Sequence, residues 1–417
     1  MEKIYKNFFV ASASRLITAF IGLIIIGFLT RHLGQTGYGA YETILSYLFI
    51  FTVLADFGLH IIHVREISRI TGGQGFKKES FISGNIFTLR LLLLVSVIIL
   101  ALAINSFLPY SEEIKRGILI ASIFVVFSSL SQILSGIFQK YEAFYYVSIS
   151  DVLTRLIHLA LVFYAVKSNL GLLSFIWILS FIALIQFGAI FLISRRFVKF
   201  SLTLNFDFAK KILKASFPVA LSILFTAIYI RTDALMLSLM KPPSDVGIYR
   251  LAAKVLEAVV FFPALLVELT MPSLSRFALN SGELFKKRFK KTFNFLFISA
   301  LPVVIGLFLF SGPIVRILGG EDFLSSALPL RILSFVVGLV FLNNLSGKAL
   351  IALDLQKAGM KIYIFGAILN ILLNLLAIPR YSYIGASVTT LITEVLVTMM
   401  MFAVLYQKTD LFRSKRV

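Results

Sequence analysis

Hydrophobic residues occur along this chain in long runs separated by short polar segments. A helix of about 20 apolar residues crosses the roughly 30 Å hydrocarbon core of a bilayer. About twelve runs reach this length, so the pattern predicts an all-α integral membrane protein with about twelve transmembrane helices. The predicted spans are 8–30, 40–63, 81–108, 117–138, 143–166, 170–194, 212–240, 246–271, 293–318, 329–353, 357–380 and 383–406.

Composition supports the same class of protein. Of the 417 residues, 59% are hydrophobic and 14% are charged. Ordinary soluble domains have an apolar share nearer half and a charged share nearer a quarter. The chain contains no cysteine. Disulfides, thiolate metal sites and cysteine nucleophiles are therefore excluded.

The net charge of +20 raises the possibility of a nucleic-acid partner, but the positions of the cations indicate another explanation. With the N-terminus inside the cell, 25 of the 40 lysines and arginines fall in inner segments and nine in outer segments. The positive-inside rule then predicts that both termini are cytoplasmic. The run FKKRFKK at 285–291 is interpreted as an anchor at anionic lipid. We expect membrane lipids as partners and no nucleic acid.

The chain also contains a weak internal repeat. GYGAYETIL at 37–45 aligns with DVGIYRLAA at 245–253, a shift of 208 residues. LGLLS at 170–174 aligns with IGASV at 384–388, a shift of 214. The same order and similar offset predict two six-helix bundles, residues 1–200 and 201–417. Duplicated folds of this kind place a substrate cleft between their halves.

Four segments carry a family resemblance that covers nearly the whole chain. They are FLTRHLGQTGYGAYETILSYLFIFTVLADFGL (28–59), YIRTDALMLSLMKPPSDVGIYRLAAKVLE (229–257), LNNLSGKALIALDLQK (342–357) and ILNILLNLLAIPRYSYIGASVTTLITE (368–394). In this order they resemble the polysaccharide-transport, Wzx-like O-antigen flippases of the multidrug/oligosaccharidyl-lipid/polysaccharide exporter superfamily. The resemblance implies a V-shaped, MATE-like transporter with a central cleft. It also implies transfer of a polyprenyl-(di)phosphate-linked oligosaccharide from the cytoplasmic to the outer leaflet of the cell membrane, alongside polysaccharide polymerases and glycosyltransferases.

Cations inside the spans are the candidate ligands for the phosphates of such a cargo. Each costs roughly 2.5–3.5 kcal/mol at the bilayer centre, so we expect them to face protein or a wet cleft. Arg15 and Arg90 are the leading candidates because a guanidinium matches phosphate oxygens geometrically. The six cations are Arg15, Arg90, Arg155, Arg231, Lys254 and Lys348.

Internal ion pairs are the alternative explanation for these cations. Asp151 with Arg155, and Lys254 with Glu257, have the spacings that place partners on one helix face. Arg231 and Asp233 lie about 200° apart around their helix, so no pair between them is expected. Arg231 either ties its helix to a neighbour, meets the cargo phosphate or extends to the outer interface.

The energy source is predicted to be an ion gradient, because no G-x-x-x-x-G-K-[ST] motif for ATP occurs. Intramembrane acids mark proton and ion routes, which makes Asp56, Asp233, Glu257 and Glu394 the candidates for coupling to H⁺ or Na⁺. Movement of cargo down its own gradient, without an ion, is the alternative. No cofactor and no metal site are expected, since metal-ligand spacings such as H-E-x-x-H are absent.

Two other functional classes remain open. An ion-coupled small-molecule or drug antiporter of the same architecture would favour a cleft rich in acids and aromatic residues. A membrane enzyme acting on lipid-linked sugars generally needs a large extramembrane domain or an acidic metal motif, and the sequence has neither. We therefore expect a transporter and not an enzyme.

Overall fold

The computed structural model describes residues 2–70, 75–280 and 282–409, and these residues form helices joined by short turns. Throughout the described ranges there is no strand. The helices are α1 (Glu2–Asp56), α2 (Leu59–Ser68), α3 (Gly75–Phe107), α4 (Glu112–Lys140), α5 (Tyr145–Lys167), α6 (Leu172–Ser194), α7 (Phe206–Met240), α8 (Pro243–Asn280), α9 (Gly282–Leu309), α10 (Ser311–Gly319), the 3-10 helix η1 (Glu321–Ser326), α11 (Ala327–Ala352) and α12 (Gln356–Thr409).

Twelve membrane spans can be counted among the described residues. Nine helical segments are long and apolar enough to cross a bilayer. Two of these are hairpins, because α1 and α12 each contain a non-helical residue, Gly34 (φ 64°) and Ser382 (φ 48°). The twelfth is α8, which carries charged residues at 250, 254 and 257 and is therefore less apolar. The prediction of an all-α membrane protein is confirmed.

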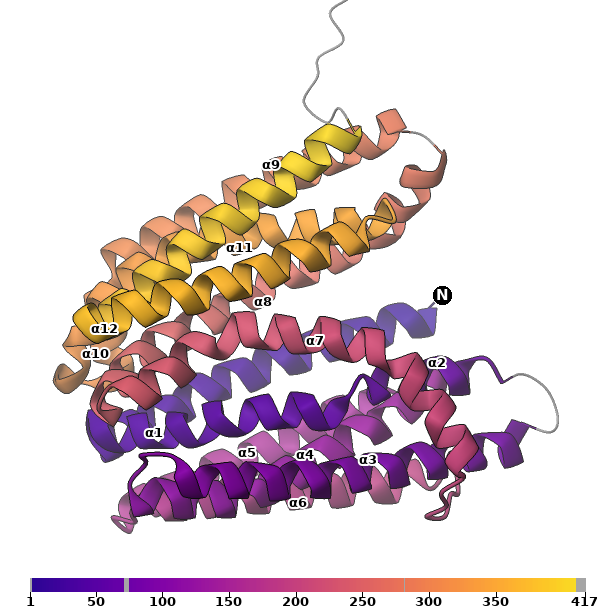
Figure 1. Cartoon of the computed structure of the whole chain (residues 1–417), viewed down its shortest axis with the longest axis horizontal. Helices are drawn as coiled ribbons and strands as arrows, with labels where there is room; N and C mark the ends of the chain where they lie inside the picture. Colours follow the sequence, from indigo (N-terminus) through magenta and orange to yellow (C-terminus); the bar gives the residue numbers. More distant parts are fainter. Residues whose placement is uncertain (1, 71–74, 281, 410–417) are drawn as a thin grey trace, which may run out of the picture. The chain divides into compact units, whose positions relative to one another are not determined.

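The reversal inside α12 brings its two limbs into contact. The Thr389 hydroxyl donates to Asn374 Oδ1 at 2.5 Å although the two residues are 15 positions apart. In a straight helix that separation would be about 22 Å. A Cβ on Gly385 would lie 2.6 Å from the carbonyl oxygen of Ala377. The limbs, orange and yellow in Figure 1, pack antiparallel, and Gly385 permits their close approach.

We expect Gly385→Ala to destabilise this hairpin by about 1–3 kcal/mol, because a methyl group has no space beside the Ala377 backbone. Thermal unfolding of the detergent-solubilised protein measures the loss. Gly359→Ala in the same helix is the control, since its new methyl group would meet Leu350 at an ordinary 3.5 Å. Equal unfolding temperatures for the two variants would contradict the close packing at Gly385.

Two predicted spans differ from the helices that form. The span 40–63 is interrupted where Phe57 (φ 46°) and Gly58 (φ 71°) separate α1 from α2. The span 293–318 is replaced by α9, which begins at Gly282, and by the separate α10. The helix extends through the basic run because Phe285 and Phe289 recur every fourth residue and are each 1% exposed. Their rings continue a stacked row with Phe293, which packs edge-on against Phe402 of α12.

The chain divides into two compact units, residues 1–227 (unit 1) and 228–417 (unit 2), and the division falls within α7. In unit 1, α4 packs against α6 and α1, and α1 packs against α5. In unit 2, α11 is central and contacts α8, α9 and α12. The division into bundles at 1–200 and 201–417 remains a prediction.

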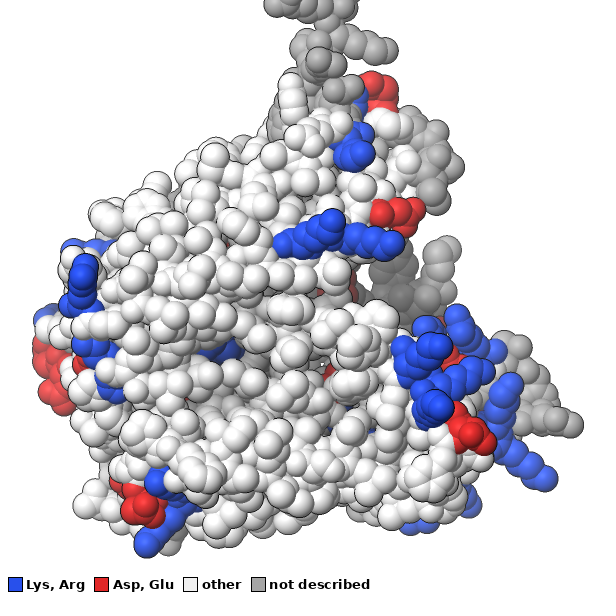
Figure 2. Space-filling model, viewed as in Figure 1, with Lys and Arg blue, Asp and Glu red and all other residues white. Residues whose placement is uncertain are grey.

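Charged side chains are distributed as expected for a protein in a bilayer. On the face drawn in Figure 2, lysines, arginines and acids gather near helix ends, and the surface between them is almost free of charge. Large apolar side chains are exposed instead, among them Phe107 (90%) and Leu376 (72%). The chain is a multi-pass membrane protein.

Candidate functional site

Arg90 and Asp56 form a buried ion pair in unit 1. Arg90 Nη1 lies 2.5 Å from Asp56 Oδ1, and the Arg90 side chain is 0% exposed. Its other N–H groups donate to the Ser129 hydroxyl at 2.8 Å, Gln132 Oε1 at 3.1 Å and the Ala55 carbonyl oxygen at 3.1 Å. We predicted Arg90 as a phosphate ligand and Asp56 as an ion-coupling acid. In this structure the two residues contact each other and neighbouring helices, and these contacts join α1, α3 and α4. Their roles as phosphate ligand and ion-coupling acid remain predictions.

Arg155 does not form the predicted ion pair with Asp151. The Asp151 carboxylate instead accepts a hydrogen bond from Gln186 Nε2 at 2.5 Å. Arg155 and Arg15 attract this carboxylate electrostatically from a longer distance. Among the described residues, Arg15, Arg155 and the half-buried Lys348 on α11 make no side-chain hydrogen bond or ion pair. These three cations keep their charge available within their spans.

Three cations in unit 2 share a single carboxylate. Glu257 Oε1 lies 3.1 Å from Arg231 Nη1 and 3.2 Å from Arg250 Nη1, and Glu257 Oε2 lies 3.8 Å from Lys254 Nζ. The predicted Lys254–Glu257 pair is confirmed, and the partner of Arg231 comes from α8. These contacts gather three cations around one carboxylate. We call these four residues the cation cluster.

Arg250 is the member of the cation cluster that the sequence analysis missed. Arg250 is not among the six cations predicted to lie inside the spans, although position 250 falls within the predicted span 246–271. The structure places it in α8, 2% exposed. The internal repeat contained a signal for the importance of Arg250, because the alignment of 37–45 with 245–253 places Arg250 opposite Glu42. Glu42 is also buried, 2% exposed, and accepts a hydrogen bond from the Tyr38 hydroxyl at 3.3 Å. Equivalent positions in the two halves therefore carry opposite buried charges.

Asp233 lies in a second polar site, where its observed hydrogen bonds come from neutral groups. Its Oδ2 accepts from the Tyr249 hydroxyl at 2.9 Å and the Thr390 hydroxyl at 2.7 Å, and its Oδ1 accepts from Asn374 Nδ2 at 2.6 Å. Asn370 Oδ1 accepts from the same Asn374 amide at 2.9 Å. Asp233 is 4% exposed. This oxygen-rich cluster joins α7, α8 and both limbs of α12, and we call it the Asp233 site.

Glu394 lies near the Asp233 site and belongs to the second limb of α12. Its Oε2 accepts a hydrogen bond from Asn343 Nδ2 at 2.7 Å, and Glu394 is 8% exposed. The two carboxylates are close enough to repel one another. In the part of the chain that the structure describes, no three His, Cys, Asp or Glu residues are grouped to hold a metal ion.

A buried acid near the N-terminus of α3 has a structural role. Glu79, 6% exposed, forms an ion pair with Lys140 and accepts a hydrogen bond from the Tyr141 hydroxyl at 2.5 Å. Tyr141 follows α4 and lies outside the spans. Burial, followed by the hydrogen bond and charge of Glu79, raises the pKa of Tyr141 to about 12. The phenol therefore remains a donor at physiological pH and joins the ends of α3 and α4.

Two known proteins with similar sequences are named for polysaccharide biosynthesis and O-antigen transport. The capsular polysaccharide biosynthesis protein CapF of Staphylococcus aureus is 23% identical over 400 residues, which is 94% of this chain and 96% of the relative. The putative O-antigen transporter of Escherichia coli K12 is 22% identical over 382 residues, 91% of each protein. Both similarities extend over nearly the full length.

The fold and the family are shown by two further comparisons. A solved structure of the lipid II flippase MurJ in an inward closed conformation has a TM-score of 0.80 at 17% identity, covering 95% of this chain and 87% of that chain. This similarity shows the fold alone. The family model described as MatE matches residues 218–376, and the one described as polysaccharide biosynthesis protein matches residues 4–278. The chain therefore belongs to the polysaccharide biosynthesis protein family of membrane transporters.

Proposed function

We propose that this chain is a flippase that moves a polyprenyl-(di)phosphate-linked oligosaccharide from the cytoplasmic to the outer leaflet for surface polysaccharide biosynthesis. The proposal places it in the plasma membrane with both termini cytoplasmic. The observation that carries it is the cation cluster, in which Arg231, Arg250 and Lys254 all contact Glu257. The names of the relatives, a capsular polysaccharide protein and an O-antigen transporter, support the same class of cargo.

The charge of the cation cluster suits a phosphate. A cation in the bilayer is costly, so three cations gathered at one point favour the approach of an anionic group such as a diphosphate. Arginine offers a planar fork to phosphate oxygens, and a charge-assisted hydrogen bond contributes about 1.5–3 kcal/mol. Arg15, Arg155 and Lys348 supply further cations for successive positions of the phosphate during alternating access. Polysaccharide polymerases and glycosyltransferases are the proposed functional partners.

The Asp233 site is the proposed place of ion coupling, with Na⁺ as the ion. Hard cations prefer carboxylate, amide and hydroxyl oxygens, and Asp233, Asn370, Asn374 and Thr390 bring these together. Asp56 and Glu257 are less suitable because arginines already neutralise them. Glu394 is a second acid through which a proton could act in place of sodium. Ion binding at Asp233 would change the charge balance among the helices that it joins.

A flipping assay tests the proposed function. The full-length protein is reconstituted in vesicles with a fluorescent polyprenyl-diphosphate oligosaccharide, and movement between leaflets is followed by dye quenching. We expect transport by the wild type and none by protein-free vesicles. Arg250→Gln should reduce transport by about tenfold, the value of roughly one charge-assisted hydrogen bond. The fold should survive because Arg231 and Lys254 still neutralise Glu257.

Arg316→Gln is the control for this substitution. Arg316 is 61% exposed in α10 and pairs with Glu321, so its removal should leave transport unchanged. Absence of transport by the wild type, or full transport by Arg250→Gln, would contradict the proposal. Export of lipophilic drugs with no movement of the glycolipid would indicate the alternative, a small-molecule antiporter, which the MatE match at 218–376 favours.

A further inference from the structure

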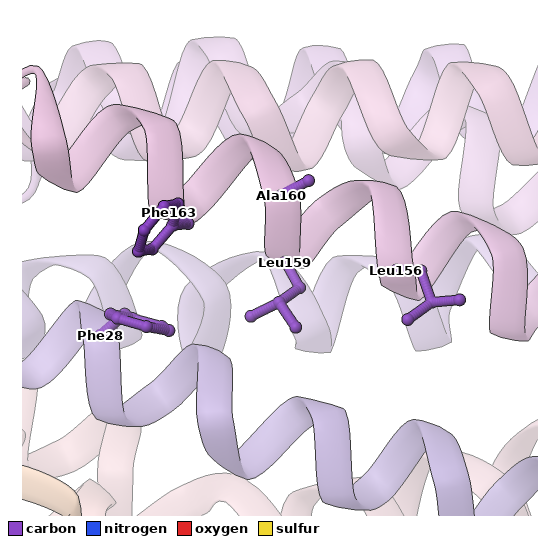
Figure 3. Close-up of a pocket in the computed structure, with 5 residues that line it drawn as sticks. All are labelled: Phe28, Leu156, Leu159, Ala160 and Phe163. Atoms are coloured by element: carbon purple, nitrogen blue, oxygen red, sulfur yellow. The ribbon is translucent and has the colours of Figure 1, made fainter.

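A hollow of about 350 Å³ opens along the seam between α1 and α5 in unit 1. All five residues that line it are apolar. In Figure 3 the side chains of Leu156, Leu159 and Phe163 form a row along α5 and point toward α1, where Phe28 faces Phe163. Leu156 and Phe163 are 47% and 43% exposed, so the hollow is open to the outside of unit 1. The lining residues are Phe28, Leu156, Leu159, Ala160 and Phe163; we call the hollow the α1–α5 groove.

A guanidinium lies in the same seam at one end of the α1–α5 groove. Arg155 immediately precedes Leu156, and its side chain extends toward α1. Arg155 Nη2 lies 3.6 Å from the position that a Cβ on Gly22 would take. Gly22 precedes Phe28 by six residues, or about 9 Å along α1. The groove therefore runs from Phe163 toward a cation that lies beside Gly22 of α1.

A second cation, Arg15, accompanies Arg155 at this end of the groove. Arg15 and Arg155 both act on Asp151, whose hydrogen bond goes to Gln186. Two cations therefore lie beside the apolar groove. A molecule that complements both features has a long apolar tail and an anionic head. Polyprenyl phosphates and phospholipids both have this chemistry, and depth in the bilayer distinguishes them.

The depth of Arg155 favours the polyprenyl phosphate. Arg155 is near the middle of the 23 residues of α5, about 15 Å from either end of the helix. A phospholipid resting in its leaflet keeps its phosphate at the surface of the membrane, away from this position. A cargo whose phosphate crosses the bilayer must pass this depth. Its tail would then replace contacts with surrounding lipid by contacts with the α1–α5 groove.

The geometry points to the α1–α5 groove as the site that holds the polyprenyl tail of the cargo while Arg155 contacts its phosphate. This inference rests on the proposed function and adds a location for the lipid part of the cargo. The tail lies against Leu159 and Phe163 and remains in an apolar environment. The headgroup and glycan lie on the side of the seam where Arg155 and Arg15 supply charge.

Photolabelling tests the groove directly. The full-length protein in vesicles is exposed to a photoreactive polyprenyl phosphate, and mass spectrometry identifies the labelled peptides. We expect labels on α1 near Phe28 and on α5 near Leu159. Ala160→Trp, which fills the groove, should reduce this labelling by about tenfold, the equivalent of about two buried methylene groups. Arg155→Gln should reduce it by about tenfold through the lost charge-assisted hydrogen bond.

Ile157→Trp is the matched control. Ile157 is 41% exposed, lies three residues before Ala160 on the same helix and does not line the groove, so labelling should equal that of the wild type. Inorganic diphosphate should compete with the probe in the wild type and in Ala160→Trp, but not in Arg155→Gln. This pattern separates loss of the tail contact from loss of the phosphate contact. If either substitution only disturbed the fold, labelling and competition by diphosphate would both be lost in that variant.

Two results would overturn the inference. One is equal labelling of the wild type and Ala160→Trp. The other is labelling of the groove by photoreactive phosphatidylglycerol to the same extent and without dependence on Arg155, since ordinary lipid would then fill it. The flipping assay keeps the two proposals apart. If the wild type transports the glycolipid and Ala160→Trp is labelled and transports normally, the groove inference fails while the proposed function stands.

Discussion

Arg90→Ala is expected to destabilise unit 1 by about 3–5 kcal/mol, the cost of leaving a buried charge without its partner. The substitution would leave the Asp56 carboxylate uncompensated between α1 and α3 and remove hydrogen bonds to Ser129 and Gln132. Thermal unfolding of the purified protein measures the change. We expect a lower unfolding temperature and a smaller yield of folded protein.

Two comparisons make this expectation specific. Arg69→Ala removes a 68% exposed arginine that pairs with Glu66, and should change stability by less than about 1 kcal/mol. The double variant Asp56→Ala, Arg90→Ala should lose less stability than the two single losses combined, since neither charge is left alone. If Arg90→Ala unfolds at the wild-type temperature and loses only affinity for the cargo, Arg90 is a phosphate ligand and not a structural anchor.

Asp233→Asn is expected to remove the dependence of transport on a sodium gradient. Asparagine has nearly the same shape and can keep part of the hydrogen-bond network, but it lacks the charge that favours a cation. In the vesicle assay, we expect an inward or outward sodium gradient to change the wild-type rate by on the order of tenfold, a typical coupling between two sites. The variant should give one rate under all gradients.

The control for this variant is Asp322→Asn, which changes an exposed acid of η1 and should leave the sodium response intact. A proton gradient is applied in parallel. Loss of a proton response in Glu394→Gln, with no sodium response in the wild type, would assign coupling to Glu394 and protons. A sodium response that persists in Asp233→Asn would exclude the Asp233 site as the coupling site.

Most of the fold could be predicted because bilayer thickness sets a minimum length for each apolar run. Ten of the expected spans overlap their helices closely, and the short turns at Gly34 and Ser382 lie between expected spans. The exceptions have local causes. The break at Phe57 and Gly58 depends on backbone conformation that hydropathy does not report. The extension of α9 depends on a four-residue phenylalanine period hidden among lysines.

The candidate site was less predictable because helix spacing reveals only partners within one helix. The Lys254–Glu257 pair was found in this way. The partners of Arg90 and Arg231 lie on other helices, and Asp151 bonds to Gln186 on α6. Which helices are neighbours is decided by packing over long sequence separations. A charge count in the sequence therefore identifies candidate residues, whereas their pairing requires the tertiary structure.

Asp233 stands at a junction of four helical segments, since Tyr249 comes from α8 and Asn374 and Thr390 come from opposite limbs of α12. The hydrogen bonds that hold these four segments together therefore all depend on the charge of one carboxylate. A cation that binds this carboxylate would weaken its hydrogen bonds to Tyr249, Asn374 and Thr390 together. The concentration of that cation in the surrounding water would then determine how firmly α7, α8 and α12 are held together.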